Sequence, residues 1–250
     1  MINIKSLYYP KINSFIKDVN LSMNSGEVLG IAGQMASGKS LFLKAIANLP
    51  VSKFNFENKD FSKLLPNELI SYCNSSVSVD SGLNLKEFLL TSLLYKKPFF
   101  SPHSPESIET VTYYAKHFDL SDVLSTPLTE LSECQFQLAL LAHAFSRGSK
   151  ILLLDNPSKL LDIKSVSNLQ REISRYSMHN DSIIMIAENN LSFLFQCCDK
   201  IAFINNGEIL EILKPHDINS EKIKKYFTID VIVSKNIING KPIIQPLGES

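Results

Sequence analysis

The apolar and polar positions along the chain follow several different periods. Residues 2–8 and 15–23 alternate apolar with polar side chains, which predicts half-buried antiparallel strands. Residues 28–32, 151–154 and 183–187 are continuous apolar runs instead, and such runs are typical of strands covered on both faces. The pattern therefore predicts two kinds of sheet, one antiparallel and half-exposed, the other parallel and buried.

Shorter runs add to the predicted β structure. Residues 69–73 form a brief apolar run after a polar stretch and are expected to be a strand. Two more apolar runs, 201–204 and 209–212, flank the sequence Asn205-Asn206-Gly207. Asn-Gly between apolar runs is a strong hairpin signal, so these two runs are predicted to pair with each other.

Helical spacing occurs between the strands. It runs over 83–95 and 108–118, which are separated by a proline-containing loop at 97–105, and it resumes at Ser132. The order is strands, a glycine-containing loop, helices, and then buried strands that alternate with helices. This order predicts an α/β fold with a parallel core sheet, an antiparallel β edge and a helical subdomain.

The stretch that carries chemistry is a loop between the strand at 28–32 and a predicted helix at 41–47. It fits G-x-x-x-x-G-K-[ST], the pattern of a phosphate-binding loop. Its glycines let backbone N–H groups turn toward phosphate oxygens, and the helix N-terminus favours negative charge. Lys39 is expected to contact the β- and γ-phosphates, and Ser40 to bind Mg²⁺. The residues predicted to bind nucleotide here are Gly33, Gln34, Met35, Ala36, Ser37, Gly38, Lys39 and Ser40.

Composition narrows the class of protein. Among 250 residues, 25 lysines and arginines balance 25 aspartates and glutamates. This balance argues against a nucleic-acid partner held by bulk electrostatics. No apolar run is long enough to span a membrane and no leader opens the chain, so we expect a cytoplasmic protein. The four cysteines lack the spacing of a zinc site, and we expect reduced thiols.

Further motifs follow the loop in a fixed order. They are Leu131-Ser132-Glu133-Cys134-Gln135, Ile151-Leu152-Leu153-Leu154-Asp155-Asn156-Pro157 and Ser158-Lys159-Leu160-Leu161-Asp162. With them the chain resembles the ATP-binding subunits of ABC transporters over nearly its whole length. The resemblance implies the ABC ATPase fold, with a P-loop NTPase (RecA-like) core in a single domain over 1–250. That domain divides into a nucleotide-binding core (1–80 and 135–213), a helical subdomain (81–134) and a C-terminal extension (214–250).

The resemblance also implies roles for single residues. Tyr9 corresponds to the aromatic residue that stacks on adenine, and Asp155 to the carboxylate that joins Ser40 at Mg²⁺. Ser132 begins the signature stretch, which in this family contacts the nucleotide held by a second chain. The implied cofactors are therefore ATP and Mg²⁺.

Two stretches resemble one branch of the family. Residues 64–70 and 226–244 are similar to segments of importers of iron–siderophores, haem and cobalamin. This resemblance implies transmembrane permease subunits as partners, with a periplasmic or surface binding protein acting indirectly. It also implies a second ATP-binding chain, either a copy of this one or an intact paralogue. The chain is then expected to lie peripherally on the inner face of the cell membrane.

The departures from the family fall on its catalytic positions. Asn156 replaces the glutamate that deprotonates the attacking water, and an amide cannot accept that proton. Glu188 aligns with the family's switch histidine, where a carboxylate would repel a γ-phosphate. Glu133 and Cys134 replace two signature glycines that allow close backbone approach. The family's Q-loop glutamine aligns with Asn74 or Ser75.

Each departure also has an ordinary structural interpretation. Ser132 and Gln135 fit a helix cap, Asn156 fits a turn before proline, and Glu188 fits a solvated helix start. Taken together, however, the departures touch most catalytic positions and spare the phosphate loop. They predict a chain that binds nucleotide and hydrolyses it slowly.

Two hypotheses follow. In the first, the chain is the ATP-binding subunit of an ABC importer and couples ATP binding and hydrolysis to transport of an iron–siderophore, haem or cobalamin-type ligand. In the second, it is a catalytically impaired subunit that binds ATP, or no nucleotide at all, and acts as a scaffold or regulator beside a competent cassette. A soluble ABC protein of DNA repair or translation, or a P-loop kinase or GTPase, fits the motifs less well.

Overall fold

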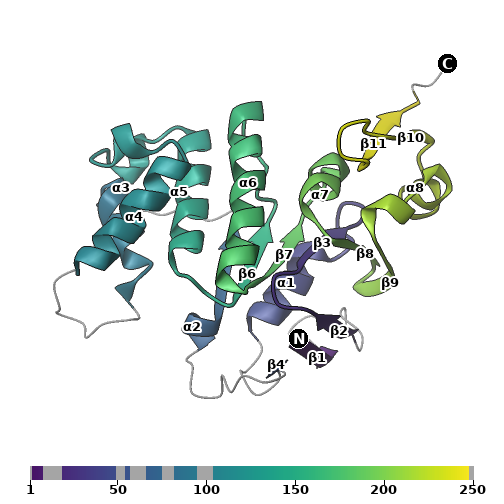
Figure 1. Cartoon of the computed structure of the whole chain (residues 1–250), viewed down its shortest axis with the longest axis horizontal. Helices are drawn as coiled ribbons and strands as arrows, with labels where there is room; N and C mark the ends of the chain where they lie inside the picture. The colour runs from purple at the N-terminus through teal and green to yellow at the C-terminus, as the bar shows by residue number, and fades with distance from the viewer. Residues whose placement is uncertain are drawn as a thin grey trace.

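The computed structural model describes residues 2–7, 19–48, 54–56, 66–74, 82–94 and 104–247. A six-stranded sheet runs through the middle of the molecule (Figure 1). Its neighbouring strands are parallel, except for the pair at one edge, which is the predicted hairpin. In spatial order the strands are β5 (Ile70–Asn74), β6 (Ile151–Asp155), β7 (Ile183–Ala187), β3 (Val28–Ala32), β8 (Lys200–Asn205) and β9 (Glu208–Leu213).

Two smaller antiparallel sheets accompany the central one. The N-terminal sheet has the order β2-β1-β4, from β2 (Val19–Met23), β1 (Ile2–Leu7) and β4 (Phe54–Phe56). Its first two strands confirm the predicted antiparallel pair within the described residues. The strand β4 lies in a polar stretch for which no strand was predicted. Near the C-terminus, β10 (Val231–Lys235) and β11 (Pro242–Pro246) form a separate hairpin.

Apolar side chains cover both faces of the central sheet, as the continuous apolar runs predicted. Along β6, Ile151 and Leu153 join one buried cluster with helix α1 (Lys39–Ala47), whereas Leu152 and Leu154 join a second cluster with the larger helices. This alternation follows from the two-residue period of a strand. The helices are therefore divided between the two faces, and the functional loop lies on the α1 side.

Helices α3 (Leu85–Thr91), α4 (Pro105–His117) and α5 (Glu133–Ser146) gather at one end of the sheet (Figure 1). The predicted helices are confirmed, although α4 begins at Pro105, inside the stretch expected to be loop. Proline suits this first position because its missing N–H would have no partner there. The remaining helices are α2 (Pro66–Leu69), α6 (Ile163–Asn180), α7 (Leu191–Cys197) and α8 (Ser220–Phe227).

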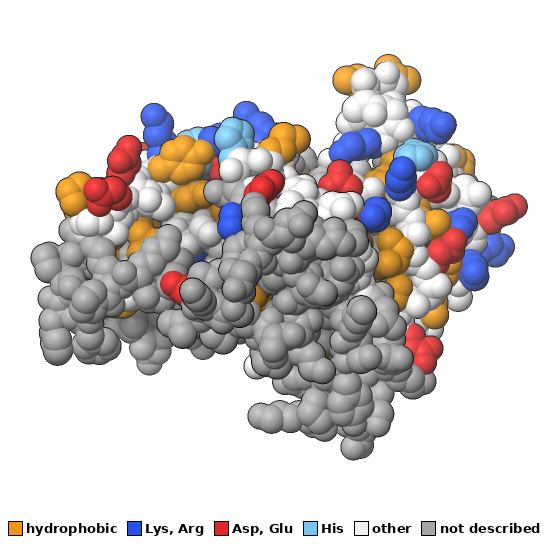
Figure 2. All heavy atoms as spheres, turned by 60° about the horizontal axis from the view of Figure 1, so that its bottom comes forward, with side chains coloured by type: hydrophobic (Ala, Val, Ile, Leu, Met, Phe, Trp, Pro, Cys, Tyr) orange, Lys and Arg blue, Asp and Glu red, His pale blue; other side chains and the backbone are white. Residues whose placement is uncertain are grey.

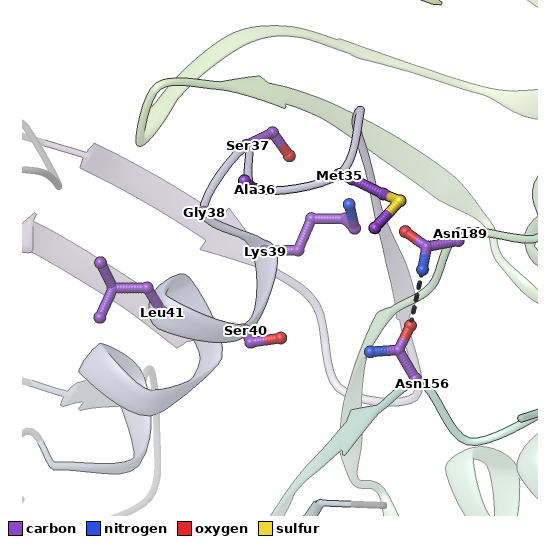
Figure 3. A pocket seen from close by; sticks show the side chains of 9 residues that line it. All are labelled: Met35, Ala36, Ser37, Gly38, Lys39, Ser40, Leu41, Asn156 and Asn189. Carbon is purple, nitrogen blue, oxygen red and sulfur yellow. Dashed lines mark hydrogen bonds between the residues drawn. The ribbon is translucent and has the colours of Figure 1, made fainter. Parts of the chain in front are cut away.

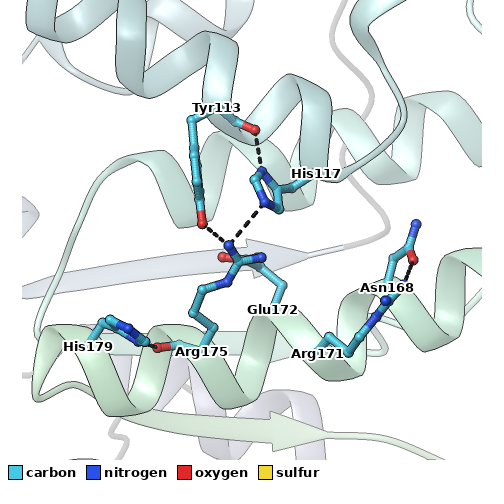
Figure 4. A network of polar contacts seen from close by, with 7 residues as sticks. All are labelled: Tyr113, His117, Asn168, Arg171, Glu172, Arg175 and His179. Carbon is cyan, nitrogen blue, oxygen red and sulfur yellow. Dashed lines mark hydrogen bonds and ion pairs between the residues drawn. The ribbon is translucent and has the colours of Figure 1, made fainter.

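Helix α4 is tied to α6 by a polar network (Figure 4). Arg175 on α6 pairs with the buried Glu172 at 2.7 Å and donates hydrogen bonds to the hydroxyl of Tyr113 and to Nε2 of His117, the latter at 3.0 Å. The division of the chain into subdomains remains a prediction. Because α5 begins at Glu133, the proposed boundary after residue 134 falls within its first turn.

The described surface carries no large block of one charge on the face seen in Figure 2, where acidic and basic side chains are interspersed. This agrees with the formal net charge of zero. Within the described residues, no helix combines the length and apolar character that a bilayer crossing requires.

Candidate functional site

The loop between β3 and α1 has the close backbone packing that its glycines predicted. A Cβ atom at Gly33 would lie 2.3 Å from the carbonyl oxygen of Ile204, which no side chain could tolerate. Gly38 has φ 103°, in the region open to glycine. Ala36 also has a positive φ, of 60°. The sequence thus folds into a tight cradle whose open side faces a pocket.

Lys39 is buried at the base of this cradle. Its Nζ donates hydrogen bonds to the carbonyl oxygens of Gly33 at 2.7 Å and Gln34 at 2.8 Å. Burial lowers the pKa of the ammonium, and the nearby carboxylates of Asp155 and Glu188 act in the opposite direction. An ammonium held by neutral carbonyls in a buried position can turn toward a stronger acceptor, such as a phosphate oxygen.

Ser40 and Asp155 meet at the C-terminal end of the sheet, as the resemblance implied. The Ser40 hydroxyl donates to Oδ1 of Asp155 at 2.8 Å. On the other side, the Tyr72 hydroxyl from β5 donates to Oδ2 at 2.9 Å. Burial, together with Asp155, strongly raises the pKa of Tyr72, so the phenol keeps its proton and acts as the donor.

Two amide side chains face the loop across a pocket of about 430 Å³ (Figure 3). Asn156 donates from Nδ2 to Asp155 Oδ1 at 3.1 Å, and it accepts from Nδ2 of Asn189 at 3.3 Å. The pocket is lined by Met35, Ala36, Ser37, Gly38, Lys39, Ser40, Leu41, Asn156 and Asn189. Asn156 therefore stands beside the phosphate loop, as its place in the sequence predicted.

Glu188 does not line this pocket, and the expectation that its carboxylate faces a γ-phosphate needs correction. The side chain is turned to the segment after β6, where Oε2 accepts from the hydroxyl of Ser158 at 2.7 Å. Neighbouring residues at the end of a strand point in opposite directions, so Asn189, one position later, faces the pocket instead. Any direct catalytic part for Glu188 remains a prediction without a contact to support it.

The signature stretch lies away from this chain's own pocket. Ser132 caps α5: its hydroxyl accepts from the N–H of Gln135 at 3.2 Å, and the Gln135 side chain accepts from the N–H of Ser132 at 2.9 Å. This reciprocal pair is the capping box that the ordinary interpretation predicted. Glu133 occupies the first turn of the same helix. The proposed contact of Ser132 with a partner's nucleotide stays a prediction.

Other predicted positions have mixed outcomes. Gln34 turns away from the pocket, and its Nε2 donates to the carbonyl of Tyr226 at 3.3 Å. Met35 is 87% exposed at the pocket mouth. Asn74 ends β5 directly opposite Asp155. Tyr9 and Ser75 lie outside the residues that the structure describes, so the adenine contact remains a prediction.

Sequence reasoning missed two residues at the site, Tyr72 and Asn189. Both follow from the sheet order, because β5 and β7 flank β6 and bring their C-terminal ends to Asp155. Strand order cannot be read from one sequence. The first residues after a buried parallel strand are candidates for a ligand site, and this rule could have found Asn189 but not Tyr72, which lies within its strand.

The donor set fits a magnesium–nucleotide complex. Mg²⁺ takes hard oxygen ligands and commonly uses one or two protein groups beside the phosphates, which the hydroxyl of Ser40 and the carboxylate of Asp155 could supply. No cluster of three His, Cys, Asp or Glu side chains suited to a metal occurs in the described part of the chain. A Cβ at Gly33 would meet the carbonyl oxygen of Ile204 and the hydroxyl of Ser37, so the loop can turn this tightly only with glycine at this position.

Comparison with known proteins finds one family of sequences. The sequence profile of the ABC transporter family matches residues 16–159. The chain is 23% identical over 225 residues to a phosphonates import ATP-binding protein of Fusobacterium nucleatum, covering 85% of this chain and 91% of that protein. It is 25% identical over 245 residues to an ABC transporter ATP-binding protein of Methanocaldococcus jannaschii, covering 95% and 94%.

Solved structures agree on the fold. One, described as a metal-chelate type ABC transporter in an inward-facing conformation, has a TM-score of 0.78 at 17% identity and covers 98% of this chain and 96% of its own. A dimeric ATP-binding cassette bound to ADP and phosphate has a TM-score of 0.72 at 20% identity, with 86% and 98% covered. The sheet order and helix placement described above are thus those of ATP-binding cassettes.

Proposed function

Because the chain belongs to the ABC transporter family, we propose that it is the ATP-binding subunit of an ABC importer with weak hydrolysis at its own site. The observation that carries this proposal is the pocket itself. One side has a complete phosphate loop, with Lys39 in place and Ser40 paired with Asp155. The other side has amides where a general base is needed.

In the proposed complex, the side chains and backbone of the loop bind the phosphates of the nucleotide. Lys39 exchanges its carbonyl partners for β- and γ-phosphate oxygens. The backbone N–H groups over 33–38 and the N-terminus of α1 supply the remaining positive potential. Ser40 and Asp155 would hold Mg²⁺, which would neutralise phosphate charge. Tyr9 stacks on the adenine.

Hydrolysis requires that a water near the γ-phosphate lose a proton. Asn156 lines the pocket and is suitably placed to orient this water, but its amide cannot accept the proton. Asn189 donates to Asn156, so it orders that side chain without supplying a base. Loss of a general base typically costs roughly 10²–10⁴ in rate, which is the expected deficit of this site.

The proposed partners are two permease subunits and a second ATP-binding chain, either a copy or an intact paralogue. Ser132 and Glu133 would face that second chain's nucleotide, which fits their position outside this chain's pocket. A binding protein would deliver the ligand to the permease. The assembly places this chain at the inner face of the membrane.

The proposed ligand class is an iron–siderophore, haem or cobalamin. Its support is the resemblance of residues 64–70 and 226–244 to that branch. The second stretch runs from the end of α8 through β10 and into β11. The likeness in fold to a metal-chelate type transporter is consistent with this class.

A second candidate function is a scaffold or regulatory subunit beside a competent cassette. It is favoured by the two amides at the pocket together with Glu133 in the signature stretch. In that case the chain binds ATP and closes on its partner, and turnover occurs mainly where the partner supplies the base.

Two measurements separate the candidates. Titration of labelled ATP tests nucleotide binding, and steady-state ATPase of the chain, alone and with its permease subunits, tests turnover. ATP binding with slow turnover that the permease stimulates supports the importer subunit. ATP binding with no turnover by the chain alone or with its permease subunits, and turnover only when a competent cassette is added, supports the scaffold. Absence of ATP binding overturns both.

A further inference from the structure

Glu188 is a buried carboxylate that the pocket does not use directly. It follows β7, its backbone N–H donates to the carbonyl oxygen of Ile31 on β3 at 3.3 Å, and it is only 4% exposed. A buried carboxylate is costly unless donors surround it, so the contacts of this side chain indicate what it does.

Four donors converge on the two oxygens of Glu188. Oε2 accepts from the backbone N–H of Ser158 at 3.1 Å and from its hydroxyl at 2.7 Å. Oε1 accepts from the backbone N–H groups of Asn189 at 2.8 Å and Asn190 at 3.3 Å. Hydrogen bonds to a carboxylate are stronger than those between neutral groups. One side chain thus joins the segment after β6 to the segment after β7.

These two segments carry the amides that face the phosphate loop. Asn156 lies just before Ser158, and Asn189 lies just after Glu188 (Figure 3 shows the two amides). In the segment after β6, two non-glycine residues have positive backbone φ angles, 50° at Asn156 and 68° at Leu160. Non-glycine residues keep such conformations only when the surrounding structure fixes them.

We propose that Glu188 is a positioning residue: its carboxylate locks the segments 156–160 and 188–190 together and so fixes where Asn156 and Asn189 stand over the nucleotide. This role rests on the proposed function of the pocket. It is distinct from a catalytic role, since the carboxylate is turned to Ser158 and away from the pocket.

The charge of Glu188 adds a second effect that makes the role measurable. The carboxylate is close enough to Lys39 to favour the charged ammonium. It also places negative charge behind a phosphate site. Removing the Glu188 carboxylate therefore relieves its repulsion of ATP and, at the same time, loosens the side chains of Asn156 and Asn189. A positioning residue of this kind separates affinity from turnover, whereas general unfolding would lower both.

The first test is hydrogen exchange at single amides in the full chain. In Glu188→Ala the N–H groups of Ser158 and Asn189 should exchange about ten- to a hundredfold faster, because each loses a charge-assisted bond. The decisive amide is Asn156, whose N–H binds the carbonyl of Ala187 and not Glu188. We expect it to exchange faster too. Unchanged exchange at Asn156 would overturn the proposal.

The second test is an ATP titration with single-turnover hydrolysis. Glu188→Ala should keep an ATP dissociation constant within about threefold of wild type, on the tighter side, because a like charge is gone. Turnover should fall. Ser158→Ala removes only the hydroxyl donor and should produce a smaller loss that is not additive with Glu188→Ala. Additive losses would show that the two residues act separately, and a parallel loss of affinity would show general unfolding; either result would overturn the proposal.

Glu172→Ala is the matched control. Glu172 is also a buried glutamate, 3% exposed, but its partner is Arg175 on α6, away from the pocket. This variant should leave exchange at Asn156 and ATP affinity unchanged. If wild type binds no ATP, the proposed function fails while the exchange experiment still decides whether Glu188 holds the two segments.

Discussion

The two sides of the pocket differ in how they relate to the family. The loop side, residues 33–41, keeps every group that holds phosphate, and its lysine is already inside the cradle. The amide side, residues 155–158 and 187–190, keeps Asp155, has Asn156 where the resemblance implies a general base, and presents Asn189 to the pocket. The proposed function thus assigns binding and turnover to separate segments, so that one can be kept while the other is weakened.

The amide side is also well ordered by hydrogen bonds. On the amide side each polar group has a partner: Asn189 binds Asn156, Asn156 binds Asp155, and Glu188 binds Ser158. Asp155 and Glu188 are buried, Asn156 is half-buried and Asn189 is exposed, and buried carboxylates cost little stability when they are paired. The residues that depart from the family's pattern here are therefore held in place by hydrogen bonds to their neighbours.

The largest effect should come from the loop side. Lys39→Ala removes the charge-assisted contact with phosphate and should weaken ATP binding by about ten- to a hundredfold, or ~1.5–3 kcal/mol. Titration of labelled ATP against both proteins measures it. Lys44→Ala on the exposed side of α1 is the control, because it keeps the loop and changes net charge equally. Equal affinities for Lys39→Ala and wild type would contradict the assignment of the loop.

A gain of function should come from the amide side. Asn156→Glu supplies a general base next to Asp155 and should raise ATP turnover by about tenfold, part of the roughly 10²–10⁴ that such a base provides. The rescue stays incomplete because Asn189 still offers an amide. Phosphate release under steady-state conditions measures it, with Asn156→Gln as the uncharged control. A wild-type rate that is already high and does not change on substitution would show that position 156 does not activate water.

Asp155 lies on the amide side of the pocket and binds Ser40 of the loop side, so its other partner, Tyr72, allows a finer test. Tyr72→Phe leaves Asp155 without the donor to Oδ2 and should weaken the Mg²⁺-dependent part of ATP binding by about fivefold, close to one ordinary hydrogen bond. Titration of ATP with Mg²⁺ and with a chelator separates this part from the contribution of Lys39. Tyr113→Phe, which loses a hydroxyl at the contact between α4 and α6, serves as the control. A similar loss in the chelator would show that Tyr72 supports the pocket only through general stability.

The smallest effect concerns the proposed partner chain. Glu133→Gly removes a negative charge from the first turn of α5 and should tighten ATP-dependent pairing about two- to fivefold, as expected for an exposed charge. Sedimentation with and without ATP measures pairing of the chain with itself or with a competent cassette. Pairing that is no tighter in the variant would indicate that residues 131–135 do not face a partner's nucleotide.

Local patterns were sufficient for most elements of the fold and for half of the site. Continuous apolar runs predicted the buried strands, and the spacing of Gly33, Gly38 and Lys39 predicted the cradle, because both depend on neighbouring residues in the chain. Ser132 and Gln135 likewise predicted the helix cap, which forms within a single turn. The strand β4 escaped prediction, since its three residues stand alone in a polar stretch.

Which side chain faces the pocket was decided only by tertiary structure. The sequence predicted that Glu188 faces the phosphate. In the structure the Glu188 side chain is buried, and the next residue, Asn189, lines the pocket. Ser158, thirty residues away in the chain, captures the carboxylate and leaves the pocket to Asn189. Tyr72 reaches Asp155 for the same reason, because the order β5-β6-β7 sets three distant strands side by side. Sequence spacing determines local backbone, and only the packing of strands determines which side chains meet.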